Sequence, residues 1–170
     1  RKLSKNELID LSKSSDCIIA GTELYDKEVL EKLGNLKILS RLGVGLDNID
    51  LKFAEQKKIK VFTTPTSPGL AVSELVLGLM LNISRHISRH DKNLKEGRWK
   101  KEMGSLLKGK TLGIIGLGTI GRNLVELTKG FEFKLLAFDI NQDKLYAKQN
   151  NVHYCSLDDL LSNSDIISIH

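Results

Sequence analysis

The stretch from Thr111 to Arg122 constrains the fold of this chain more than any other. An apolar run leads into three glycines, Gly116, Gly118 and Gly121, which have the spacing G-x-G-x-x-G. In such a stretch the first glycine permits a tight turn out of a strand, and the second lets a pyrophosphate approach the backbone. The third lets the following helix pack close to the sheet. Free N–H groups at the start of that helix favour an anion. The stretch therefore predicts the strand, turn and helix of a dinucleotide-binding domain.

The residues that follow the glycines support this interpretation. A second predicted strand, 134–138, leads into Asp139, which lies roughly 20 residues beyond the glycines, where a ribose-binding acid is expected. A carboxylate there accepts hydrogen bonds from the 2′-hydroxyl of NAD and repels a 2′-phosphate, and residues 140–142 contain no arginine. NAD is therefore favoured, although the nearby Lys144 leaves NADP open. The alternative is an ordinary strand–turn–helix in which Asp139 caps the next helix.

Length and composition limit the class of protein. The chain has 170 residues, of which 41% are apolar and 28% charged, so it is expected to form one globular domain or two small ones. No apolar span is long enough to cross a membrane, and the first residues lack a signal-peptide core. Cys17 and Cys155 match no metal spacing and indicate a reducing, cytoplasmic setting. The net charge of +5 is mild for a nucleic-acid binder and suits small anionic substrates.

The first half of the chain alternates between predicted strands and helices, which indicates a parallel sheet. The apolar run within 16–21 predicts a short buried strand, and further strands are expected at 36–40 and 59–63. Helices are expected at 26–33 and 51–58, after a helix that Ser4 opens with a capping box. A helix standing first implies that a preceding strand is missing.

Pro65 and Pro68 mark a break before one long predicted helix, at about 70–95. This helix is apolar on nearly all sides, so we expect it to be buried between two domains or two subunits. The predicted domains are 1–86 and 87–170. In the second, strands are expected at 111–115, 134–138, 152–154 and 165–169, with a short helix at 156–161. A complete doubly wound sheet has about six strands, so this one is expected to be incomplete at its C-terminal end.

The loop from Ser40 to Asp50 follows a predicted strand, at the edge of the sheet where ligands of parallel sheets bind. Gly43, Val44 and Gly45 can turn successive N–H groups inward as an anion-binding nest, which would suit a carboxylate. Asp47, Asn48 and Asp50 are expected to cap the next helix rather than to bind a metal ion. A purely structural role for the loop remains the alternative.

Several motifs together resemble the D-isomer-specific 2-hydroxyacid dehydrogenases, and within them the branch that acts on D-3-phosphoglycerate. The segments that carry the resemblance, which spans about residues 16–170, are 41–50, Thr64-Pro65, Val72-Ser-Glu74, Gly97-Arg-Trp99 and 109–121. It implies part of a flavodoxin-like substrate-binding domain at 1–86 and an incomplete Rossmann NAD-binding domain at 87–170, with the active site between them. It implies an oxidoreductase that transfers a hydride between NAD and a D-2-hydroxy acid or 2-keto acid. The favoured substrate is 3-phosphoglycerate, in serine biosynthesis, with glyoxylate, hydroxypyruvate and D-lactate left open.

The resemblance also implies roles for individual residues. Backbone N–H groups of Val44 and Gly45 would hold the substrate carboxylate, with help from Arg41. The long helix would contribute to a homodimer. The implied cofactor-binding residues are Thr64, Val72, Gly116, Gly118, Thr119, Ile120, Gly121, Asp139 and His170.

The family's catalytic Arg, Glu and His would all lie beyond His170, so no catalytic residue is expected within this chain. His170 would lie near the cofactor without taking part in the chemistry, and His153 is expected on the surface of a strand. His86 and His90 have the i, i+4 spacing of a metal pair, but a solvated helix end is the favoured interpretation.

Two functions of other classes remain as alternatives. One is a non-catalytic, corepressor-like protein that senses NAD. The other is nucleic-acid binding through the basic segment 85–110, for which a solvated face near an anionic cofactor is the favoured explanation.

Overall fold

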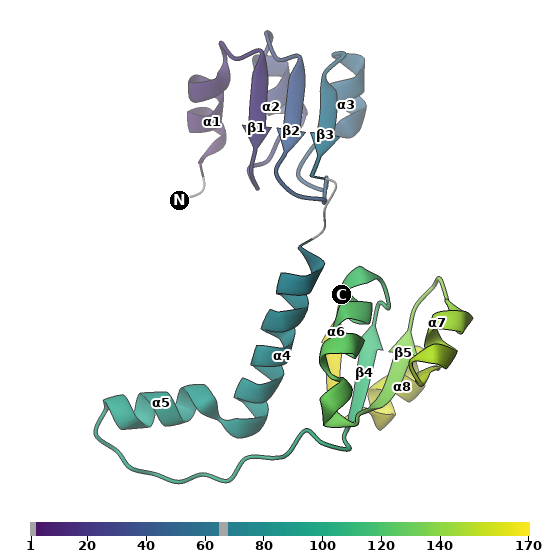
Figure 1. Cartoon of the computed structure of the whole chain (residues 1–170). Coiled ribbons are helices and arrows are strands. Elements are labelled where there is room, and N and C mark those ends of the chain that lie inside the picture. The colour runs from purple at the N-terminus through teal and green to yellow at the C-terminus, as the bar shows by residue number, and fades with distance from the viewer. Residues whose placement is uncertain (1–2, 65–67) are drawn as a thin grey trace. The chain divides into compact units, whose positions relative to one another are not determined.

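The computed structural model describes residues 3–64 and 68–170, and these form two compact units (Figure 1). The first unit comprises residues 1–67 and the second comprises residues 68–170. The predicted domain boundary lay at 86/87, so the helix before that point falls in the second unit. The function predicted for each part stays a prediction, and Pro65, where a break was expected, lies outside the described residues.

The first unit is a parallel three-stranded sheet with the strand order β1-β2-β3. Its strands are β1 (Cys17–Ala20), β2 (Ile38–Arg41) and β3 (Lys60–Thr63), and its helices are α1 (Lys5–Ser12), α2 (Lys27–Lys32) and α3 (Leu51–Gln56). Each predicted strand and helix of this region is therefore confirmed. The core lies between helices and sheet, and includes Val29, Leu30, Leu39 and Ala54.

One face of this sheet is open within the chain, which corrects the prediction that 16–21 is a buried strand. Successive side chains of a strand point to opposite faces. In β1, Ala20 is fully buried and Ile18 packs on the core, whereas Ile19 between them is 81% exposed. Phe62 in β3 is likewise 52% exposed. An unbroken apolar run predicted the strand correctly but not that only one of its faces is covered.

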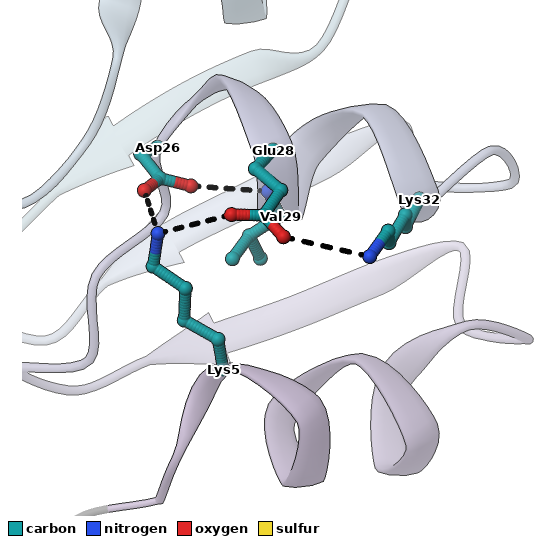
Figure 2. A network of polar contacts seen from close by, with 5 residues as sticks. All are labelled: Lys5, Asp26, Glu28, Val29 and Lys32. Atoms are coloured by element: carbon teal, nitrogen blue, oxygen red, sulfur yellow. Dashed lines mark hydrogen bonds and ion pairs between the residues drawn. The ribbon is translucent and has the colours of Figure 1, made fainter.

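A network of charged side chains ties α1 to α2 (Figure 2). Asp26 caps α2, because its Oδ1 accepts the Val29 N–H at 3.1 Å. Lys5 from α1 donates to both Asp26 and Glu28, and Lys32 pairs with Glu28 at 3.5 Å. The Lys5 ammonium and the Val29 N–H both lower the pKa of Asp26. The Asp26 carboxylate therefore both caps α2 and binds Lys5 of α1.

The predicted long helix is in fact two helices, α4 (Gly69–Arg85) and α5 (Ile87–Lys95), which are bent by 65°. His86 between them has the left-handed backbone conformation, with φ of 56°. The side chain of Asn82 stabilises the break, since its Oδ1 accepts both the N–H and the hydroxyl of Ser88, at 2.8 and 2.9 Å. The prediction of one helix was wrong because these contacts replace the helical bonds at the junction.

Among the described residues, one side of α4 is buried and the opposite side is exposed. Ser73 and Met80 are buried against the rest of the second unit, whereas Leu75, Leu79 and Ile83 share an exposed stripe. Within the described residues, no single helix is long and apolar enough to span a membrane, and the bent pair α4 and α5 meets that test only when counted together.

The second unit is a parallel four-stranded sheet with the strand order β6-β5-β4-β7. This order corresponds to 3-2-1-4 along the chain, as in a doubly wound dinucleotide-binding sheet. The predicted strands are confirmed, as is the capped helix that begins after Ser156. The elements are β4 (Thr111–Ile115), α6 (Thr119–Leu127), η1 (Lys129–Phe131), β5 (Lys134–Phe138), α7 (Lys144–Gln149), β6 (Val152–Tyr154), α8 (Leu157–Asn163) and β7 (Ile166–Ile169).

Two neighbouring residues of β4 show that helices cover both faces of this sheet. A Cβ added at Gly113 would clash with Leu160 and Ser164, so α8 packs on that face. The next residue, Ile114, points the other way and lies against Gly121 of α6. The centre of the sheet is therefore enclosed between α6 and α8, and the β4–α6 turn lies at the C-terminal edge of its central strand.

Candidate functional site

The turn after β4 begins with a glycine that no other residue could replace without strain. Gly116 has φ of +95°, and a Cβ added there would lie 2.5 Å from the carbonyl oxygen of His170. Its N–H donates to the Phe138 carbonyl at 2.9 Å. The first glycine of the motif thus turns the chain sharply between the ends of β5 and β7.

Gly118 is different, because nothing in the described chain requires a glycine there. Its backbone is extended, with φ of −79°, and a Cβ added there would meet no atom within 4 Å. Gly118 is also the N-cap of α6, where no side chain caps the helix. Within the described residues the N–H groups of Thr119 and Ile120 have no acceptor. The open space and the free N–H groups fit a bound pyrophosphate.

Gly121 allows α6 to pack against the sheet. A Cβ at this position would clash with the carbonyl oxygen of Gly116 and would lie 3.1 Å from Ile114. A fully buried hydroxyl lies beside this turn, since the one proton of the Ser73 hydroxyl in α4 is shared between the carbonyls of Gly69 and Ile120, at 2.7 and 3.0 Å. Ser73 was not predicted, although a serine within an apolar helix was the available signal.

Asp139 holds the glycine turn itself. Its Oδ2 accepts the Leu117 N–H at 2.7 Å, and its Oδ1 accepts the Asn141 N–H at 2.8 Å. These two N–H groups, with Asn141 the larger cause, lower the pKa of the carboxyl. The alternative that Asp139 caps the next helix is wrong, because Asp143 caps α7 by accepting the Tyr146 N–H at 3.0 Å.

Arg122 also stabilises the glycine turn, and this role was not predicted from the sequence. Its Nε–H donates to the Leu117 carbonyl at 3.1 Å, and its Nη1 pairs with Asp143 at 3.0 Å. The guanidinium lies 4.5 Å from the centre of the Tyr146 ring. Leu117 is therefore held at its N–H by Asp139 and at its carbonyl by Arg122.

His170 follows β7, beside the first glycine. Its Nε2 lies 3.0 Å from the Ser168 hydroxyl, and burial lowers the pKa of the imidazole. The neutral form is therefore favoured.

The loop after β2 contains the second group of predicted site residues. Gly43 has φ of +142°, and its N–H donates to the Thr64 hydroxyl at 2.9 Å. The predicted nest therefore loses one of its three donors. In the described part of the chain, the N–H groups of Val44 and Gly45 have no acceptor, and Val44 is 51% exposed. Two neighbouring donors remain for an anion.

Asn48 links the loops that follow β1 and β2. Its Nδ2 donates to the carbonyls of Gly21 and Glu23 at 3.3 and 2.7 Å, and its Oδ1 accepts from Nε of Arg41 at 3.4 Å. Of the three predicted helix caps, Asp50 does cap α3, by accepting the Phe53 N–H at 3.0 Å. Asn48 does not, because its amide is used between loops.

The predicted site residues thus form two groups, one in each unit. Arg41, Val44, Gly45 and Thr64 lie on neighbouring strand ends of the first unit. The second unit holds Val72 in the first turn of α4 and the residues of the glycine turn, with Asp139 and His170. His86 and His90 have ring centroids 6.4 Å apart, and the described residues contain no group of three or more possible metal ligands.

Comparison with known proteins gives a consistent result. The family model described as D-isomer specific 2-hydroxyacid dehydrogenase, NAD binding domain, matches residues 77–170. A hydroxypyruvate reductase of Thermotoga maritima is 40% identical over 99% of the chain, which spans 55% of that protein. A D-3-phosphoglycerate dehydrogenase of Archaeoglobus fulgidus is 39% identical over 99% of the chain, which spans 32% of it.

A solved structure, D-lactate dehydrogenase from Aquifex aeolicus with NAD and lactic acid, is similar with a TM-score of 0.82 and 29% identity. The match covers 99% of this chain and 50% of that one. The chain therefore spans about half or less of the length of these proteins.

Proposed function

Because this chain belongs to the D-isomer-specific 2-hydroxyacid dehydrogenases, we propose that the protein transfers a hydride between NAD and C2 of a D-2-hydroxy acid or its 2-keto acid. The observation that carries the proposal is the turn after β4. It combines the open space at Gly118, two N–H groups without an acceptor among the described residues and the acid Asp139 with its lowered pKa, at the C-terminal edge of a sheet with the 3-2-1-4 strand order.

NAD is the cofactor of this family's matched domain, and it supplies the hydride chemistry when bound. The N–H groups of Thr119 and Ile120 would hold its pyrophosphate over Gly118, and Asp139 would accept the ribose hydroxyls. Val72 and His170 are proposed nearer the nicotinamide. These residues would bind and orient the cofactor.

The substrate would bind through the first unit. The N–H groups of Val44 and Gly45 are adjacent, exposed and without an acceptor among the described residues, so they suit the two oxygens of a carboxylate. The Arg41 guanidinium lies against the same loop, since a Cβ added at Gly43 would lie 2.6 Å from its Nη1. Arg41 would add a positive charge beside the carboxylate or a phosphate.

We propose 3-phosphoglycerate as the first substrate to test, which would place the reaction in serine biosynthesis. A relative named for this activity and one named for hydroxypyruvate have nearly equal identity to the chain. Glyoxylate, hydroxypyruvate and D-lactate are therefore the competing substrates. We also propose a homodimer that uses α4 and α5, and a cytoplasmic setting consistent with the free cysteines Cys17 and Cys155.

The test is steady-state kinetics of the full-length gene product with NADH and four acids: phosphohydroxypyruvate, hydroxypyruvate, glyoxylate and pyruvate. Turnover of one of them, and NADH binding that weakens in Asp139→Ala, is the expected result. NADH binding without turnover of any acid would contradict the proposal and favour an NAD-sensing protein. Salt-sensitive binding of a random duplex would instead favour the nucleic-acid alternative.

A further inference from the structure

We propose that Thr64, which follows β3, is a positioning residue for the substrate carboxylate. It would set the direction of the Val44 and Gly45 N–H groups without touching the substrate. The inference rests on the proposed function of these two N–H groups. It also gives Thr64 a different role from the cofactor contact that the sequence predicted.

Three hydrogen bonds join Thr64 to the loop after β2. The Gly43 N–H donates to the Thr64 hydroxyl oxygen at 2.9 Å, and the hydroxyl donates to the Arg41 carbonyl at 3.3 Å. The Thr64 N–H donates to the Gly43 carbonyl at 3.1 Å. Gly43 is therefore held at both its N–H and its carbonyl by a single residue of the neighbouring strand end.

The planarity of the peptide bond carries this restraint to the substrate site. The Gly43 carbonyl and the Val44 N–H belong to the same planar, trans peptide unit, so they point in opposite directions. Because Thr64 holds that carbonyl toward β3, the Val44 N–H points away from β3. The hydroxyl holds the preceding peptide unit, whose N–H is that of Gly43.

Gly43 is the residue whose backbone rotation the hydrogen bonds of Thr64 restrain. Its φ of +142° is a conformation that side chains disfavour, and a glycine there can rotate more freely than any other residue. The loop is held at its other end by Asn48, which bonds to the carbonyls of Gly21 and Glu23. Val44 and Gly45 lie between these two attachment points, and their N–H groups remain free within the described chain.

The capacity of the hydroxyl also argues against a hydrogen bond donated from Thr64 to the cofactor. A threonine hydroxyl has one proton to donate and two lone pairs to accept with. The proton is directed to Arg41 and one lone pair to Gly43. One lone pair is left, so the hydroxyl can donate to NAD only by giving up its bond to the loop.

The experiment compares Thr64→Val, Thr64→Ser and Thr63→Val in the full-length gene product. Valine keeps the shape and removes the hydroxyl, and serine restores it. Thr63 is an exposed neighbour whose side chain has no hydrogen bond among the described residues, so Thr63→Val is the matched control. For Thr64→Val we expect the KM of the 2-keto acid to rise on the order of tenfold, while the Kd of NADH stays within about twofold. Thr64→Ser and Thr63→Val should keep KM close to that of the wild type.

Amide hydrogen exchange gives a second readout that needs no activity. Thr64→Val should speed the exchange of the Gly43 amide on the order of tenfold, and thermal unfolding should show that the protein remains folded. Weaker NADH binding with an unchanged KM would overturn the proposal and make Thr64 a cofactor contact. An unchanged KM together with unchanged exchange would also overturn it. If the wild type turns over none of the four 2-keto acids and does not bind oxalate, used here as a small carboxylate probe, the proposed function fails. The exchange rate of the Gly43 amide then shows whether Thr64 restrains the loop even though the loop binds no substrate.

Discussion

At the scale of single residues, the three glycines of the motif have separable roles. Gly116 is required by its backbone conformation, Gly121 by close packing, and Gly118 by neither. Only the last position can therefore separate cofactor binding from folding.

We expect Gly118→Ala to fold like the wild type and to bind NADH at least about tenfold more weakly. The added methyl group meets no protein atom within 4 Å but lies where the pyrophosphate would approach. Calorimetric titration with NADH, alongside thermal unfolding, measures both effects. The control is Gly130→Ala, since that glycine also has open space around its Cβ but is in η1. Unchanged NADH affinity in Gly118→Ala would exclude a close pyrophosphate.

Asp139 should also contribute to stability in a pH-dependent way. Its pKa is lowered from the ordinary 3.8 in the folded state, so its contribution is complete above that value. The contribution is lost as the pH falls through the lower, folded-state pKa. We therefore expect the wild type to have a larger free energy of unfolding than Asp139→Asn. The difference should be constant above about pH 5 and should shrink as the pH falls below about 4. Urea unfolding of both proteins across this range measures the difference, and a gap that widens toward acid would contradict the assignment.

At the scale of elements, the junction of α4 and α5 shows how side chains can end a helix without Gly or Pro. His86 has a left-handed conformation that costs a residue with a Cβ about 1 kcal/mol. The Asn82 and Ser88 contacts offset that cost.

His86→Gly should therefore raise the free energy of unfolding of the second unit by about 1 kcal/mol, because glycine adopts this conformation without strain. The matched control is His90→Gly, within α5, which should lower it by a similar amount. Chemical unfolding of the three proteins gives these values. A loss of stability in His86→Gly would show that the imidazole makes contacts that outweigh the strain.

At the scale of the whole molecule, the exposed apolar stripe of α4 supports the proposed dimer. Leu75 and Ile83 are 62% and 73% exposed within the chain. We expect the double variant Leu75→Asp with Ile83→Asp to halve the mass measured by sedimentation of the full-length gene product. The control is Leu11→Asp, which changes an equally exposed leucine of α1. A wild type that sediments as a monomer would remove the basis of this prediction.

The sequence predicted the strands well because each is a short apolar run next to a glycine, a proline or a capping residue. The sequence also predicted Gly118 and Asp139 as cofactor-binding residues, because their spacing is characteristic of one local strand–turn–helix–strand unit. It did not predict the contacts of Arg122, Ser73 and Thr64 with other parts of the fold, which are with Asp143, Ile120 and Gly43. Those contacts depend on which strands and helices become neighbours in the folded unit, and the residues at these positions do not encode that locally. The helix break at His86 was missed for a different reason: local hydrogen bonds between Asn82 and Ser88 produce it, and the apolar pattern of the helix does not report them.

The bond between Asp139 and the Leu117 N–H has a consequence for changing which dinucleotide the protein prefers. Replacing an acid at this position by a neutral or basic residue is the direct way to accept a 2′-phosphate. Here a basic or apolar replacement would also leave the Leu117 N–H without its acceptor and loosen the turn that every dinucleotide must use, whereas asparagine keeps an amide oxygen that can accept it. A protein engineered to use NADPH would therefore need an uncharged acceptor for Leu117, either the amide oxygen of an asparagine at position 139 or a group supplied by a second substitution, so selectivity and turn geometry have to be redesigned together.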